Sequence, residues 1–378
     1  MDESMLFIVI MLVGIGLVML YSAGYATAAS KKAMEYDPNY FVKNQSIYAV
    51  IGFIGLYVAS RFDYHLYAKL NPLIAAGTLA LMYLTPFIGT SVKGARRWLF
   101  GFQPSEIAKF AIIVFFATMM CKMGKKRMKT FRWGFLFYLG CLGVLLGSLV
   151  LQKHLSAIMI ISITCGIMMF VGGTRFVYLI TLVGIGVTGA VAYILKNSYA
   201  MARIKVWLDP FSDFRGAGWQ ASQSWMAISS GGLWGMGLGQ GRQKHLFLPE
   251  PANDFIFAVV CEELGFVGAM LVLLVFAFFI IRGYVIAIKA ADKFGTLIAT
   301  GVTTHIALQI IMNICVVSGL MPVTGISLPF FSYGGTSLVV LLCEVGVLLN
   351  ISRFKAVLPE EENKKPKHSA VNGGLMEE

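Results

Sequence analysis

The sequence predicts an all-α polytopic membrane protein, and three observations support this fold class. Of the 378 residues, 57% are apolar and only 13% are charged, about half the ~25% of an ordinary soluble protein. The mean hydropathy is +0.75. The apolar residues form continuous runs that can cross a hydrocarbon core of ~30 Å, whereas a β-barrel would show shorter alternating segments. The composition therefore excludes a soluble globular enzyme, a disordered chain and a disulfide scaffold.

We expect ten spanning helices, because polar connections separate ten apolar runs of about 17–25 residues. The second and sixth runs are short, and only residues 152–154 separate the fifth from the sixth. An even number of spans places both termini on the same side of the membrane. The expected spans are 5–26, 46–60, 71–90, 105–121, 134–151, 155–172, 176–195, 255–281, 296–318 and 327–351.

The distribution of lysine and arginine orients these spans. With both termini in the cytoplasm, the inner segments hold 17 of these cations and the short outer loops hold seven, as the positive-inside rule requires. Attraction to the anionic inner leaflet explains the inner run Lys122–Arg132. The net charge of +12 therefore indicates membrane lipids as partners and not nucleic acid.

The two ends of the chain and its cysteines have simple interpretations. Residues 26–28 (Ala-Thr-Ala) resemble a signal-peptidase site, but acidic Asp2 and Glu3 precede the apolar run, so we expect an uncleaved first span. The six cysteines lie in or beside spans without a CxxC pair, as expected of small buried hydrophobic residues. The charged segment 356–378 is expected to be a disordered cytoplasmic tail, which leaves 1–355 as one transmembrane domain.

The longest connection, residues 196–254, lies on the outer side and contains four tryptophans. Loops of this length are usually functional or disordered, and the amphipathic stretch Ala202–Leu208 indicates a structured loop at the membrane surface. The run Gly231–Gly241 lacks the GxGxxG spacing, and Lys244 lacks the preceding glycine of a Walker A motif. We therefore expect close backbone packing or anion contact by loop amides.

Asp254 stands at the start of the eighth span, and two interpretations fit it. It is a suitable helix N-cap, because Asp favours that position and an apolar run follows. It is also a carboxylate at a membrane boundary, where partial desolvation raises its pKa toward that of a general base. Glu250 is a second carboxylate nearby, and Glu262 and Glu263 lie about two turns into the span, where ionisable residues are usually functional.

Cations on the outer loop before the fourth span oppose the inside bias of positive charge. Arg96 and Arg97, beside Trp98, either bind phosphate oxygens through their planar guanidinium groups or anchor the loop at the lipid headgroups.

The fourth span begins at residues 103–106 (Gln-Pro-Ser-Glu), which are typical of a helix start. Glu106 and Lys109 are three residues apart and share a helix face. An ion pair inside a span usually has a function, although purely structural pairing is an alternative.

Residues 321–336 precede the last span and contain Pro322, Pro329 and a glycine pair. They predict a broken or re-entrant helix, which is tolerated only where it lines a cavity. These polar features all fall on the outer side of the predicted topology, which indicates an extracytoplasmic active site. The residues expected to line its cavity are Gln103, Ser105, Ser332, Tyr333, Gly334 and Gly335.

Seven motifs, in this order, closely resemble the SEDS family (shape, elongation, division and sporulation), and its FtsW/SpoVE branch more than RodA. The resemblance spans residues 5–353. The motifs are 93–98 (KGARRW), 103–109 (QPSEIAK), 237–244 (GLGQGRQK), 248–257 (LPEPANDFIF), 262–265 (EELG), 319–325 (GLMPVTG) and 329–335 (PFFSYGG).

The resemblance implies a ten-span peptidoglycan glycosyltransferase that polymerises lipid II on the outer leaflet of the bacterial cytoplasmic membrane. It also implies a class B penicillin-binding protein, a transpeptidase, as partner. By this resemblance Asp254 is the essential catalytic carboxylate, Glu106 and Lys109 are the family's polar pair, and Trp98 is important. One residue departs from the pattern: the family commonly has an acid between spans five and six, where this chain has His154.

The implied reaction assigns a hypothetical role to each group. Asp254 would deprotonate the acceptor hydroxyl, which would attack the donor sugar with inversion. No cofactor is required, although a divalent cation, Mg²⁺ or Mn²⁺, could take part, and the metal site is unknown. The rival functions are a lipid II flippase and a non-catalytic division scaffold. The outer residues expected to bind the substrate or its pyrophosphate are Arg96, Arg97, Trp98, Glu106, Lys109, Arg242, Lys244 and Glu250.

Overall fold

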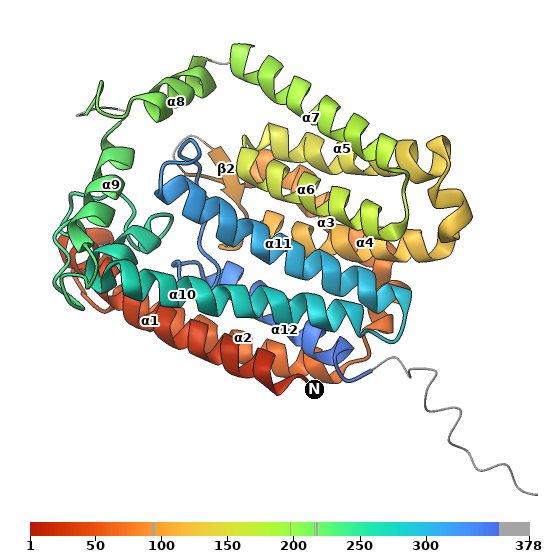
Figure 1. Cartoon of the computed structure of the whole chain (residues 1–378), viewed down its shortest axis with the longest axis horizontal. Helices are drawn as coiled ribbons and strands as arrows, with labels where there is room; N and C mark the ends of the chain where they lie inside the picture. The colour runs from red at the N-terminus through yellow and green to blue at the C-terminus, as the bar shows by residue number, and fades with distance from the viewer. Residues whose placement is uncertain (93–94, 197, 215, 217, 355–378) are drawn as a thin grey trace, which may run out of the picture.

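The computed structural model describes residues 1–354 except 93–94, 197, 215 and 217, and these residues form an elongated helical bundle (Figure 1). Lys93 and the predicted tail 356–378 lie outside the described residues. The α-helices are α1 (Glu3–Ser30), α2 (Tyr40–Arg61), α3 (His65–Ile88), α4 (Pro104–Met128), α5 (Phe137–Leu151), α6 (Leu155–Gly172), α7 (Phe176–Lys196), α8 (Ser198–Leu208), α9 (Trp219–Gly231), α10 (Ile256–Ile288), α11 (Lys293–Val317) and α12 (Gly335–Ile351).

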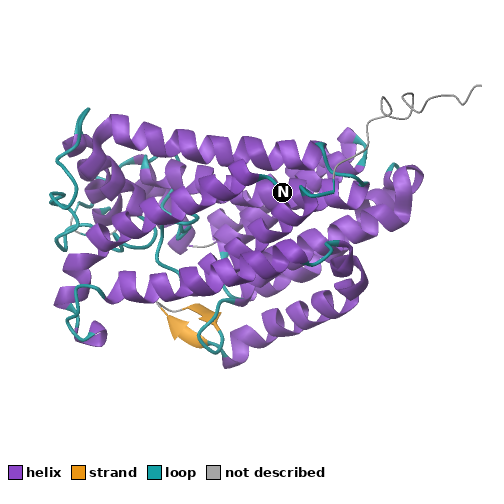
Figure 2. Cartoon of the chain, turned by 90° about the horizontal axis from the view of Figure 1, so that it is seen from below, coloured by secondary structure: helices purple, strands orange, loops and turns teal. Residues whose placement is uncertain are grey.

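Short elements complete the described chain. A 3₁₀ turn (Lys32–Met34) follows α1, and a π-helical turn (Arg132–Leu136) leads directly into α5. The antiparallel strands β1 (Thr90–Val92) and β2 (Ala95–Trp98) form a hairpin that the sequence did not predict, with Thr90 opposite Trp98. Figure 2 shows this hairpin beside the helices.

The helices occupy the ten predicted spans. Within the described residues, nine helices are long and apolar enough to cross a membrane, and α12 is a shorter apolar helix of 17 residues. Of the predicted boundaries, those of the sixth span, 155–172, agree at both ends. The two ends of the described chain meet, because the main-chain nitrogen of Asp2 donates to Ser352 Oγ at 2.9 Å. Both ends therefore lie on the same side of the bundle, as an even number of spans requires.

The last span differs from its prediction. It begins at Gly335 and not near residue 327, and residues 320–334 form turns and extended chain without a helix. The predicted break before this span is therefore present, and it takes the form of irregular chain because Pro322 and Pro329 cannot supply the amide hydrogens that a helical turn needs. At about 1.5 Å per residue, α12 is only about 25 Å long, so this irregular segment completes the crossing.

Side-chain hydrogen bonds hold the irregular segment in place. Ser332 Oγ accepts from the Leu328 main-chain nitrogen at 2.7 Å and donates to the Asn253 carbonyl at 2.6 Å. Gln45 of α2 donates to the Ser332 carbonyl and accepts from the Gly334 nitrogen, both at 3.2 Å. These bonds satisfy backbone groups that no helix pairs, which allows non-helical chain at membrane depth.

The described residues of the long outer segment include the helices α8 (Ser198–Leu208) and α9 (Trp219–Gly231), as expected of a structured loop. Figure 1 shows α9 at the end of the bundle away from the N-terminus. Two tryptophans tie the segment down: Trp207 Nε1 donates to the Gly319 carbonyl and Trp219 Nε1 to the Phe247 carbonyl, each at 2.8 Å.

The backbone of the glycine-rich run Gly231–Gly241 packs directly against the backbone of α10. This confirms the expectation of close backbone packing for this run. Helix α10 is interrupted at Gly265, where φ is 66°. The Phe266 nitrogen donates to the Gly232 carbonyl at 2.9 Å, and the Met236 nitrogen donates to the Glu262 carbonyl at 3.0 Å. A Cβ atom on Gly265 would lie 2.2 Å from the Gly235 nitrogen. Only glycine permits this approach.

We expect Gly265→Ala to lower the free energy of unfolding by roughly 2–3 kcal/mol, because it adds a backbone clash to an unfavourable φ. The melting temperature of the detergent-purified protein measures this effect. The matched control is Gly143→Ala in α5, where an added Cβ meets no atom within 4 Å. Equal melting temperatures for the two variants would contradict the packing argument.

Candidate active site

The hairpin places two arginines against neighbouring backbone. Arg96 Nη1 donates to the Phe87 carbonyl at 2.8 Å. Arg97 donates to the carbonyls of Lys153 at 2.6 Å and Gln152 at 3.4 Å, and so joins β2 to the α5–α6 turn. Trp98 is half-buried at the end of β2. The acceptors of these bonds are main-chain carbonyls of the α3 end and of the α5–α6 turn.

The first turns of α4 carry the predicted ion pair. Lys109 Nζ lies 2.9 Å from Glu106 Oε1, and the two side chains are only 4% and 13% exposed. Ser337 Oγ, in the first turn of α12, donates to Glu106 Oε2 at 2.9 Å. Gln103 stands at the N-cap and makes no side-chain capping bond. The pair therefore links α4 to the start of the last span.

Asp254 does not cap α10. The N-cap is Phe255, which makes no side-chain cap bond, so the capping interpretation was wrong. Asp254 is half-buried, and a Cβ atom on Gly325 would lie 3.3 Å from Asp254 Oδ2. The carboxylate therefore faces the irregular segment 320–334. Asn313 of α11 joins the two segments by donating to the Asp254 carbonyl at 2.8 Å and to the Ile326 carbonyl at 2.7 Å.

The irregular segment connects the two groups of polar residues. Gly325 of this segment lies beside Asp254, and the segment leads into α12, where Ser337 donates to Glu106. The Tyr333 nitrogen donates to the Ala252 carbonyl at 2.8 Å, and Gly335 packs on the ring of Tyr48. Tyr333 and Gly335, which were predicted to line the cavity, thus help to hold the backbone between Asp254 and the ion pair in place.

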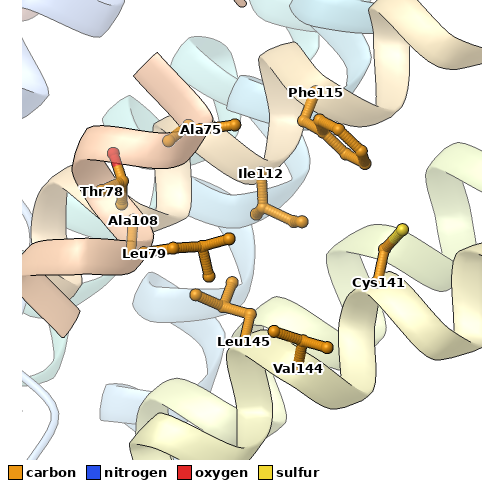
Figure 3. A pocket seen from close by; sticks show the side chains of 10 residues that line it. Ala75, Thr78, Leu79, Ala108, Ile112, Phe115, Cys141, Val144 and Leu145 are labelled. Carbon is orange, nitrogen blue, oxygen red and sulfur yellow. The ribbon is translucent and has the colours of Figure 1, made fainter. Parts of the chain in front are cut away.

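An apolar cavity of about 200 Å³ lies elsewhere, between α3, α4 and α5 (Figure 3). Ala108, Ile112 and Leu145 are among its lining side chains, and none of the predicted site residues lines it. Such a cavity can hold a hydrocarbon group but supplies no charged group for chemistry. The described residues also contain no cluster of three or more metal-ligating side chains, and the divalent cation stays a prediction.

Comparison with known proteins identifies the family. The family model described as cell cycle protein (FtsW, RodA and SpoVE) matches residues 3–357. The chain belongs to this family. A probable peptidoglycan glycosyltransferase FtsW of Geobacter sp. (strain M18) is 41% identical over 93% of this chain and 96% of its own. Stage V sporulation protein E of Bacillus subtilis (strain 168) is 41% identical over 93% and 97%.

A solved structure supports the same fold. It is described as structural coordination of polymerization and crosslinking by a peptidoglycan synthase complex. It matches with a TM-score of 0.75 and 25% identity, and covers 93% of this chain and 97% of its own. The chain is thus a polytopic membrane protein of the FtsW, RodA and SpoVE family.

Two residues expected near the pyrophosphate have other surroundings in this family member. Lys244 is buried and pairs with Glu263 Oε1 at 2.6 Å, while also donating to Ser22 Oγ at 2.8 Å. Lys244 is therefore unavailable to a pyrophosphate while this pair holds. Arg242 has an exposed side chain, and its main-chain nitrogen donates to Glu262 Oε1 at 2.7 Å.

The two glutamates of α10 are structural anchors for the glycine-rich run. Glu263 also accepts from the Gly239 nitrogen at 3.0 Å, and Glu262 accepts from the Gln243 nitrogen at 3.1 Å. Glu250 lies in a local turn, where it accepts from Asn253 Nδ2 at 2.5 Å. These three carboxylates therefore accept hydrogen bonds that hold loops in place. Glu262 and Glu263 were expected to be functional because they lie inside a span, and their hydrogen bonds to the glycine-rich run give them a structural role.

We expect Lys244→Met to lower the melting temperature sharply, because it leaves Glu263 buried without its cation, at a cost of about 3–5 kcal/mol. The double variant Lys244→Met/Glu263→Gln should recover most of that loss. Thermal unfolding of the three proteins measures the effect. A stable Lys244→Met protein with weakened substrate binding would instead restore Lys244 to the pyrophosphate site.

The structure shows a buried ionisable pair that was not predicted from the sequence. His305 of α11 and Glu344 of α12 are 3% and 2% exposed, and Nδ1 lies 3.3 Å from Oε2. Ser337 and Glu344 are seven residues apart and share one face of α12. Ionisable residues inside apolar spans are a signal visible in the sequence, but their partner could not be read from it.

Proposed function

We propose that this protein is a peptidoglycan glycosyltransferase that polymerises lipid II into β-1,4-linked glycan strands. The observation that carries the proposal is Asp254, a half-buried carboxylate that does not cap its helix and faces the irregular segment. It stands in a chain that is 41% identical to a probable peptidoglycan glycosyltransferase. A carboxylate at such a boundary has the chemistry of a general base.

The proposed reaction is a single inverting displacement. Asp254 accepts the proton from the 4-hydroxyl of the acceptor GlcNAc, and that oxygen attacks C1 of the donor MurNAc. The bond from C1 to the diphosphate breaks, and the α-linked donor becomes a β-1,4-linked product. Undecaprenyl diphosphate leaves with the bonding electrons, and the proton remains on Asp254 until solvent removes it.

Cations at the outer end stabilise the leaving group in this proposal. Arg96 and Arg97 supply planar guanidinium groups, and Lys109 supplies a buried ammonium group. Preorganised cations at the position where charge develops lower the barrier most effectively. The side chain of Lys109 is already held by Glu106, so little reorganisation is needed.

The proposed location and partner follow from the same reaction. Lipid II is presented on the outer face of the bacterial cytoplasmic membrane, so both termini are placed in the cytoplasm, as the distribution of cations favours. A class B penicillin-binding protein is the proposed partner, since the similar solved structure is described as a peptidoglycan synthase complex.

The test uses the purified full-length protein with its transpeptidase partner and labelled lipid II. We expect long glycan strands on a gel, and no strands when the substrate lacks the reducing-end diphosphate. Transport of lipid II across liposomes without any polymer would favour the flippase. Absence of both activities, from a complex that is folded, would favour the scaffold.

A further inference from the structure

The turn between α5 and α6 buries a histidine beside the outer cations. Lys153 adopts a left-handed conformation with φ of 53°, and the His154 nitrogen donates to the Leu149 carbonyl at 2.9 Å. This geometry turns His154 inward, where it is only 7% exposed. Arg97 fixes the turn from the other side through its bonds to the carbonyls of residues 152 and 153.

Two buried polar atoms of this turn, and one in the first turn of α4, are among those that lack hydrogen-bond partners within the described residues. They are His154 Nδ1, Gln152 Oε1 and Ser105 Oγ. Gln152 and Ser105 are 2% and 1% exposed. Ser105 and Lys109 are four residues apart and share a face of α4. Buried polar groups are nearly always hydrogen-bonded, so orphaned ones require an explanation, and a bound ligand is one.

The electrostatics of the turn select the kind of ligand. Burial, with the positive charges of Arg97 and Lys109, lowers the pKa of His154 to about 3. The imidazole is therefore neutral at physiological pH, and it can donate a hydrogen bond from one ring nitrogen. A neutral donor that feels the charges of two cations suits an anion, because it adds a hydrogen bond without adding a buried charge.

We propose that His154 is a substrate-binding residue that donates a hydrogen bond from Nδ1 to the diphosphate of the lipid-linked sugar. This inference rests on the proposed function, since it takes the diphosphate of that substrate as the ligand. Arg97 and Lys109 hold the same diphosphate by charge, and His154 fixes its orientation. A polar side chain of similar reach can replace the imidazole, whereas an apolar ring cannot.

The experiment compares His154→Asn and His154→Phe with wild type. The amide of Asn places a polar group where Nδ1 lies, and Phe keeps the ring shape without a donor. The control is Lys153→Asn, an exposed neighbour where Asn tolerates the left-handed conformation. Binding of undecaprenyl diphosphate and of undecaprenyl monophosphate to the full-length protein is measured, together with KM and kcat for lipid II.

We expect His154→Phe to weaken undecaprenyl diphosphate binding and to raise KM about tenfold, as for a lost bond to a charged group. His154→Asn and Lys153→Asn should stay within about threefold of wild type, and monophosphate binding should change less. Unchanged binding in the Phe variant would overturn the proposal. Equal losses in the Phe and Asn variants, with lowered melting temperatures, would also overturn it, in favour of a structural role.

The pH dependence supplies a second test that does not need the Phe variant. The ratio of wild-type to His154→Asn affinity should be constant from pH 5.5 to 8.5, because His154 stays neutral throughout. A ratio that rises as the pH falls through 6–7 would show a protonated imidazole and overturn the proposal. Diphosphate binding is measured without polymerisation, so failure of the proposed function would be seen separately, as wild-type protein that makes no strands.

Discussion

The Asp254→Asn variant should make no glycan strands while remaining folded. Asn has nearly the same shape as Asp but cannot accept the acceptor's proton, and loss of a general base typically costs 10²–10⁴-fold in rate. The fold should survive because the main-chain bond from Asn313 to the Asp254 carbonyl does not involve the carboxylate. The measurement is the rate of labelled lipid II polymerisation, with the melting temperature as the check on folding.

A matched control is Asp209→Asn in the same outer segment. Asp209 is exposed and accepts from the Phe211 nitrogen at 3.2 Å, a bond that Asn can also accept. We expect this variant to polymerise lipid II at the wild-type rate. If the Asp254→Asn variant makes full-length glycan strands, Asp254 is not the general base, whatever the control shows.

The Lys109→Met variant should lose both stability and activity. It leaves Glu106 in a site that is only 13% exposed without its cation, and breaking a buried ion pair costs about 3–5 kcal/mol. Ser337 alone would then bind the Glu106 carboxylate. Thermal unfolding and polymerisation of lipid II measure the two effects.

The double variant Glu106→Gln/Lys109→Met separates structure from function. Removing both charges should restore most of the melting temperature, because no unpaired charge remains buried. Polymerisation should stay absent, since the cation for the leaving group is gone. An active double variant would show that the pair has only a structural role, which was the alternative left open by the sequence.

The sequence predicted the spans well because the bilayer imposes a length and a composition on each of them. The sixth span, 155–172, was predicted at both boundaries. The last span was predicted eight residues too early, since residues 327–334 include the apolar Leu328, Phe330 and Phe331 but also contain Pro329 and lack helical structure. Hydropathy measures burial in lipid or protein, and it does not distinguish a helix from an extended segment bonded to its neighbours.

By itself the sequence determined the fold class, the ten apolar helices and the Glu106–Lys109 pair, because each depends on composition or on local spacing. The choice of Asp254 came from the resemblance to the family. Only the tertiary structure decided what the other charges do. Glu263 accepts a hydrogen bond from Ser22, which lies 241 residues away, and also pairs with Lys244. Arg97 and Lys109 act on His154 from two other elements. In a low-dielectric interior the role of a charged side chain depends on which groups pair with it. These partners come from distant segments, and no local sequence pattern encodes the packing that brings them together.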